Sequence, residues 1–177
     1  MTPRHLEEFR ELRATVRERG TARIWVFLAG MIGWGALTIA TASLAALPIA
    51  TFLPLLILAI TFEAVFSLHV TVERIGRYIQ VFLEEEDGWE HVAMAVGPPL
   101  KGTSVDPIFA VYFLIAVVLN IVPALLAQPV PLEVGVVLGV HLIVVIRILV
   151  ARSIASRQRA ADLKRFTELK QKAGGAG

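Results

Sequence analysis

The sequence predicts an all-α integral membrane protein, a four-transmembrane-helix bundle with amphipathic cytoplasmic helical extensions. The chain has 177 residues, of which 56% are hydrophobic, and a soluble domain of this length would carry fewer apolar runs. Four of these runs reach the roughly 20 residues that a helix needs to cross a bilayer. The residues left over form only short tails and one loop, so no soluble domain is expected.

We expect the chain to divide into an N-terminal helix, a membrane domain and a C-terminal helix. Residues 1–22 form a cytoplasmic amphipathic helix, and residues 156–177 form a basic cytoplasmic helix with a frayed tail. The transmembrane domain covers residues 23–155, in which a cytoplasmic loop of residues 71–106 separates the second span from the third. The four spans cover residues of about 24–46, 49–70, 107–127 and 134–155.

The distribution of Lys and Arg predicts the orientation. With four crossings, all of these basic residues fall on one side, and the two short connectors on the other side contain none. The positive-inside rule therefore predicts a multi-pass protein of the cell inner (plasma) membrane with both termini in the cytoplasm. A cleaved signal peptide is disfavoured, because the first apolar run is too long and four glutamates precede it.

The first helix is predicted to begin at Thr2-Pro3, since threonine is a common N-cap and proline suits the first helical position. Apolar residues then recur at helical spacing until the helix ends near Gly20. Its interspersed glutamates favour packing on another cytoplasmic helix over lying on anionic lipid headgroups. The span that follows is rich in glycine and alanine, which allow close helix contacts either within the chain or between copies.

The second span becomes amphipathic after His69 and is predicted to continue into the cytoplasm and stop near Asp87-Gly88. Acidic residues at a helix C-terminus oppose the helix dipole. Three interpretations remain open: a basic partner from one of the tails, a solvated acidic turn, or a divalent-cation site shared with Glu90 and His91. The acidic cytoplasmic patch consists of Glu84, Glu85, Glu86 and Asp87.

The third and fourth spans contain further irregular positions. Pro123 is expected to kink the last outer turn of the third span. In the fourth span, Gly135 and Gly139 have the spacing of close helix contacts. The fourth helix is expected to continue past Arg152.

Ionisable residues at membrane depth are costly and are therefore the candidate site residues. At about 1.5 Å per residue, Glu63 lies roughly 22 Å and Arg147 roughly 24 Å from the outer connectors, so we predict a buried polar pair that faces the bundle interior. His141 and Asn120 lie roughly 15 Å and 10 Å in, close enough to share a hydrogen bond. The other polar residues at membrane depth, His69 and Glu73, lie on one helix face near the inner interface.

The sequence contains no signature of catalysis. Without cysteine there is no thiolate nucleophile, disulfide or iron–sulfur ligand, and no nucleophile-elbow, zinc-protease or phosphate-loop motif is present. His69 and His141 differ in depth by roughly 16 Å, too far for one haem iron. We therefore predict no enzyme activity, cofactor or metal, and no nucleic-acid binding.

These features lead to three hypotheses. The first is a non-catalytic accessory or assembly subunit of a larger inner-membrane complex, with partners that include the lipid bilayer, other membrane subunits and anionic lipids at the basic tails. The second is a small homo-oligomeric transporter or channel that uses the Glu63–Arg147 pair. The third is a subunit that contacts a redox cofactor, pigment or quinone through His69 or His141.

Overall fold

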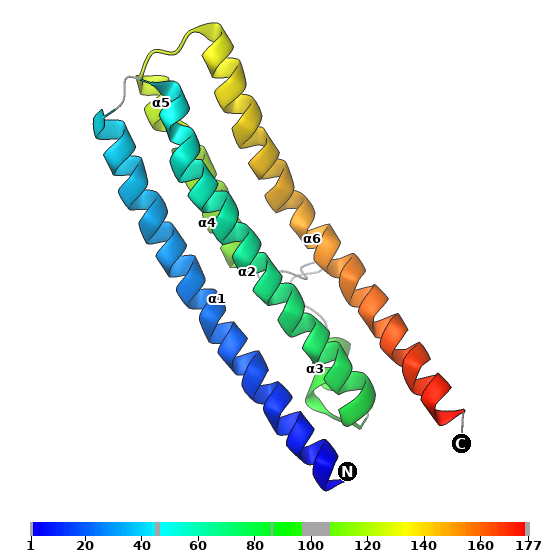
Figure 1. The fold of residues 1–177 in the computed structure, drawn as a ribbon. Coiled ribbons are helices and arrows are strands. Elements are labelled where there is room, and N and C mark those ends of the chain that lie inside the picture. The colour runs from blue at the N-terminus through cyan, green and yellow to red at the C-terminus, as the bar shows by residue number, and fades with distance from the viewer. Residues whose placement is uncertain (1, 45–46, 86, 97–106, 176–177) are drawn as a thin grey trace. The chain divides into compact units, whose positions relative to one another are not determined.

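A computed structural model describes residues 2–44, 47–85, 87–96 and 107–175. Throughout these ranges the regular structure is helical, as predicted, and four helical segments are long and apolar enough to cross a membrane. They indicate a multi-pass membrane protein. The elements in chain order (Figure 1) are α1 (Pro3–Leu44), η1 (Pro48–Thr51), α2 (Phe52–Tyr78), η2 (Ile79–Leu83), α3 (Trp89–Val96), α4 (Pro107–Leu119), α5 (Val122–Leu126) and α6 (Pro131–Gly174).

The chain divides into two compact units, each assembled from segments that are far apart in the sequence. The unit called here the charged unit contains Met1–Arg23, Ser67–Val105 and Arg152–Gly177. The unit called here the apolar unit contains Ile24–Phe66 and Asp106–Ala151. The helices α1, α2 and α6 each contribute residues to both units.

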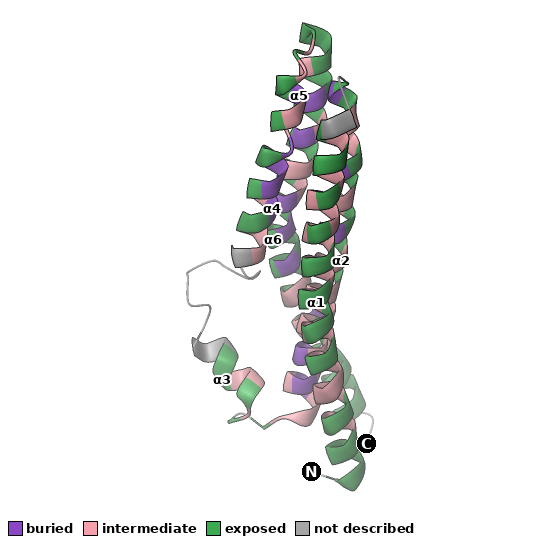
Figure 2. Ribbon diagram, turned by 90° about the vertical axis from the view of Figure 1, so that its left-hand side faces the viewer, coloured by how far each residue is buried: buried purple, intermediate pink, exposed green. Residues whose placement is uncertain are grey.

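The apolar unit is a four-helix bundle in which the order around the bundle is α1, α2, α6 and α4 (Figures 1 and 2). Partly buried side chains of α1, including Phe27 and Trp34, pack on a core supplied by the other three helices. The outward faces remain apolar, as for Ile32, which is 71% exposed, and this pattern suits a lipid environment. The core consists of Leu55, Leu58, Phe62, Val65, Phe113, Ala116, Val117, Ile148 and Ala151.

A glycine brings α1 and α2 into close contact. A Cβ atom built on Gly30 would overlap the side chain of Thr61, whereas one built on Gly35 would meet nothing within 4 Å. Gly30 of the first span therefore allows a close helix contact within the chain. Close approach of this kind is the usual basis of helix association in lipid.

Gly30→Ala is expected to lower the free energy of unfolding by about 1–3 kcal/mol, because the new methyl group must push α2 away or distort its side chains. Gly35→Ala makes the same chemical change in the same helix without a contact, so its effect should stay below about 1 kcal/mol. Unfolding of the purified variants in mixed micelles measures both. Equal stabilities for the two variants would contradict the close contact seen at Gly30.

The N-terminal helix begins as predicted but does not end where predicted. The backbone N–H of His5 donates to Thr2 Oγ1 at 3.3 Å, which makes Thr2 the N-cap. The expected end near Gly20 is wrong, since α1 continues to Leu44 without a break. A single glycine costs a helix only about 1 kcal/mol and leaves every backbone hydrogen bond possible, so it does not force an end.

The end of the second span also differs from the prediction. α2 passes into a π-helical turn, η2, that ends at Leu83, before the predicted Asp87-Gly88. Glu84 is already extended, with φ −107° and ψ 150°. Glu84, Glu85 and Asp87 therefore lie outside the helix, where their charges oppose the helix dipole less. Lys170 Nζ donates to the carbonyl of Val81, one of the last carbonyls of this helix.

The outer turns of the third and fourth spans follow the prolines. α4 stops at Leu119 and α5 begins at Val122, which confirms the predicted irregularity at Pro123. Proline has no N–H to donate to the carbonyl four residues earlier, and its ring clashes with that carbonyl. At the start of α6, Glu133 Oε2 accepts the N–H of Val130 at 2.9 Å, and the helix runs past Arg152 as predicted.

Candidate functional site

A buried hydrogen-bond network joins four segments of the apolar unit, namely α1, η1, the turn that follows α4, and α6. Asn120 is 0% exposed and His141 is 1% exposed. Asn120 Nδ2 lies 3.0 Å from His141 Nε2, which confirms the predicted hydrogen bond. Asn120 Nδ2 also donates to the carbonyl of Thr51 at 2.9 Å, and Trp34 Nε1 donates to Asn120 Oδ1 at 3.0 Å.

The partners in this network determine the position of every hydrogen. An indole N–H can only donate, so the oxygen of the Asn120 amide must face Trp34 and its nitrogen must face His141. The carbonyl of Val137 can only accept, so the hydrogen of the His141 ring lies on Nδ1, which is 2.7 Å from that oxygen. The imidazole is therefore neutral, and its second nitrogen accepts from Asn120. Both nitrogens are engaged, so neither is available to a metal or cofactor in this arrangement.

The predicted ion pair between α2 and α6 is present. Arg147 Nη2 donates to Glu63 Oε2 at 2.7 Å. The predicted burial of this pair in the bundle interior is wrong, because the side chain of Glu63 is 50% exposed and that of Arg147 is 34% exposed. The inward positions next to Glu63 are occupied by the buried apolar side chains of Phe62 and Val65, which leaves the carboxylate outward.

Aromatic rings hold the guanidinium of Arg147 from one side. Its Cζ lies 5.7 Å from the centre of the Phe62 ring and 5.0 Å from the centre of the Phe66 ring. Such cation–π contacts are strongest away from water. Arg147 Nη1 is buried and has no hydrogen-bond acceptor among the residues that the structure describes. Among the described residues, the pair is therefore only partly satisfied.

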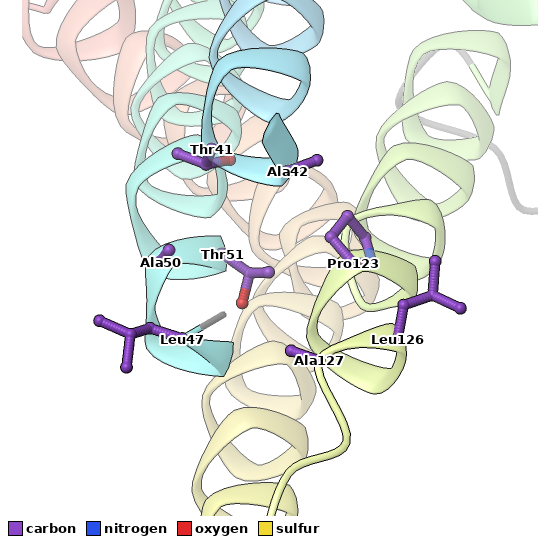
Figure 3. A pocket seen from close by; sticks show the side chains of 8 residues that line it. All are labelled: Thr41, Ala42, Leu47, Ala50, Thr51, Pro123, Leu126 and Ala127. Carbon is purple, nitrogen blue, oxygen red and sulfur yellow. The ribbon is translucent and has the colours of Figure 1, made fainter. Parts of the chain in front are cut away.

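A pocket of about 220 Å³ lies at the connector end of the apolar unit (Figure 3). In the close-up, Pro123 and Ala127 of the α5 region lie opposite Thr51 of η1. The hydroxyl groups of Thr41 and Thr51 donate to carbonyls of their own segments. No lining residue is ionisable, so the pocket offers no group for proton transfer. The lining residues are Thr41, Ala42, Leu47, Ala50, Thr51, Pro123, Leu126 and Ala127.

In the charged unit, the acidic patch has a basic partner from the N-terminal tail. Arg13 forms ion pairs with Glu84 at 2.7 Å and with Glu90 at 2.9 Å. Glu84 Oε2 also accepts the backbone N–H of Glu90 at 2.8 Å. Of the three interpretations left open, these contacts support a basic partner for Glu84. Glu85 and Asp87 are exposed, and Glu86 lies outside the described residues.

Arginines also contact the two polar residues predicted near the inner interface. His69 Nδ1 lies 3.2 Å from Arg23 Nη1, so the imidazole nitrogen accepts this hydrogen bond. Glu73 forms ion pairs with Arg159 at 2.7 Å and with Arg77 at 4.0 Å. Within the described part of the chain, no group of three His, Cys, Asp or Glu residues has a geometry that could hold a metal ion.

Several partners of the candidate residues were not predicted from the sequence. Trp34 and Thr51 complete the Asn120 network, Phe62 and Phe66 hold Arg147, and Arg13 bridges two glutamates. Trp34 could have been found, because an indole N–H inside an apolar span requires an acceptor. Ten residues separate it from Leu44, which places it roughly 15 Å from the outer connector, near the depth of Asn120.

No protein-family model, curated protein or solved structure matches this chain.

Proposed function

We propose that this protein is a non-catalytic accessory or assembly subunit of a larger complex in the cell inner membrane, with both termini in the cytoplasm. The orientation rests on the positive-inside distribution of Lys and Arg. The function rests on one observation, the outward-facing Glu63–Arg147 ion pair on the surface of the apolar unit. The residues around this ion pair explain why it favours a subunit of a larger complex.

The pair lies on a surface that is otherwise suited to lipid. On α2, Leu53, Leu56 and Ile60 are exposed in the turns that precede Glu63. A charged group at such a depth costs roughly 2.5–3.5 kcal/mol on insertion scales unless protein or water covers it. A transmembrane helix of another chain would cover the pair and could offer polar partners to its exposed atoms. The polar side chains of the Asn120 network, in contrast, are already engaged within this unit.

The size and composition of the native particle test this proposal. We expect the protein, extracted from its source membrane in mild detergent, to travel with other subunits in a particle of fixed composition. The double variant Glu63→Ala with Arg147→Ala should leave that particle, because the polar contact is lost. Ile32→Ala, an exposed apolar position on α1, should remain in it.

A particle that contains only copies of this chain would contradict the proposal. The competing hypothesis of a small transporter or channel would then be tested by flux measurements on variants of Glu63 and Arg147. An absorption spectrum of the same particle tests the hypothesis of a redox cofactor or pigment. Substitution of His69 would have to abolish any visible band for that hypothesis to hold.

A further inference from the structure

The exposed face around Glu63 is formed by two adjacent ridges in the apolar unit. On α2, Leu56, Ile60 and Glu63 follow one another at spacings of four and three residues, and all three are exposed. Residues spaced in this way lie on one side of a helix. Glu63 thus continues a ridge of apolar side chains on α2. The apolar side chains need no partner in lipid, whereas the carboxylate of Glu63 needs one.

The second ridge belongs to α6. Gly135, Gly139, Ile143 and Arg147 are spaced four residues apart, the spacing of the ridges along which helices pack. Ile143 is 67% exposed, and Cβ atoms built on the two glycines would meet nothing within 4 Å. The ion pair joins this ridge to that of α2, so both ridges border one face.

The chemistry of the pair identifies what would complete it. Glu63 receives a single hydrogen bond, at Oε2, and no other ion pair or hydrogen bond reaches it within the described residues. The side chain of Arg147 is 34% exposed, so part of it also borders this face. The exposed parts of the pair can take a cationic donor for the carboxylate and an anionic acceptor for the guanidinium, both at the depth of the pair.

We infer that the occupant of this face is a second copy of the chain, related to the first by a two-fold axis along the membrane normal. This inference rests on the proposed function and names the partner of the same site. Rotation about the normal preserves depth, so the Glu63 of each copy meets the Arg147 of the other at the same level. The four charges then sum to zero. A foreign helix would have to bring both groups to this depth, whereas a second copy necessarily carries them.

Two charge-reversal variants, one carried by each copy, test this arrangement. Glu63→Arg alone places four cations in the predicted cluster, and Arg147→Glu alone places four anions there. Each variant should weaken self-association at least about tenfold, because like charges across an interface cost several kcal/mol. Co-expression of the two variants, carrying different tags, should restore association, since each residue then faces an opposite charge. The measurement is co-purification of the two tags from membranes.

The double variant Glu63→Arg with Arg147→Glu is the matched control. It keeps the ion pair within each chain and the complementarity between copies, so it should associate like the natural protein. Failure of the divided variants to rescue each other, while this control associates normally, would overturn the second copy as occupant. The ion pair would then act only within one chain or toward another partner.

Cysteine cross-linking gives an answer that does not depend on the folding of the charge variants. Because the chain has no cysteine, Ile60→Cys and Ile143→Cys each introduce a unique thiol on the face. Oxidation in native membranes should yield a product of twice the chain mass from at least one of them. Ile32→Cys, exposed on α1, should remain monomeric.

The outcomes separate this inference from the proposed function. Cross-linking to a different protein overturns the second copy as occupant and retains an accessory subunit. Dimers in a particle without other subunits support the second copy and contradict the accessory role. An absence of cross-links at both positions, with charge reversal that has no effect, overturns both and leaves the pair facing lipid.

Discussion

Asn120→Ala is expected to lower the free energy of unfolding by about 2–4 kcal/mol, because Asn120 makes two buried hydrogen bonds and one partly buried one, of about 0.6–1.7 kcal/mol each in a transmembrane setting. The variant leaves the Trp34 N–H, the Thr51 carbonyl and His141 Nε2 without their partner. In an apolar interior, a polar group left without a hydrogen-bond partner costs more free energy than the bond itself contributes. Unfolding of the purified protein in mixed micelles, followed by far-ultraviolet circular dichroism, measures the loss.

Two further variants make the Asn120 prediction specific. Leu119→Ala changes the exposed neighbouring residue and should alter the free energy of unfolding by less than about 0.5 kcal/mol. Trp34→Phe removes one of the three hydrogen bonds of Asn120. Its loss of unfolding free energy should therefore lie between those of Leu119→Ala and Asn120→Ala. If Asn120→Ala were as stable as Leu119→Ala, the network would not contribute to stability.

Depth along the spans was sufficient to predict two contacts at membrane depth. A helix rises by a constant amount per residue, and polar groups in an apolar medium are driven to pair. These two facts predict Asn120 beside His141, and Glu63 beside Arg147, without knowledge of helix packing. The proline break in the third span was predictable for an equally local reason, the missing N–H of Pro123.

The outward direction of Glu63 could not be predicted in the same way. The part of α2 that precedes Glu63 is apolar on every side, so no helical periodicity marks its core face. Its rotation is determined by the packing of Leu58, Phe62 and Val65 against α4 and α6, which only the folded chain reveals. In the charged unit the difficulty is the opposite. Many arginines and glutamates recur there at similar spacings, so the sequence allows many ion pairs and does not single out the one between Arg13 and Glu90.

Glu90→Ala is expected to lower the free energy of unfolding by about 2–3 kcal/mol, because it removes one carboxylate from two partly buried arginines. Glu90 lies 2.9 Å from Arg13 and 3.7 Å from Arg77, and the side chain of Arg77 is only 7% exposed. The loss should stay below that of a fully buried pair. Arg13 keeps Glu84, and Arg77 keeps Glu73 at 4.0 Å and a hydrogen bond to Gln80 at 2.7 Å.

A second glutamate of the charged unit provides the matched control for Glu90. Glu168 lies 3.9 Å from Lys164 in an exposed pair one helical turn apart, so Glu168→Ala should change the free energy of unfolding by less than about 0.5 kcal/mol. Hydrogen exchange should locate the loss from Glu90→Ala in α3 and in the N-terminal turns of α1, the segments that Glu90 and Arg13 join. Equal stability of the Glu90 and Glu168 variants would show that Glu84 alone holds Arg13, and that α3 is not held by charge.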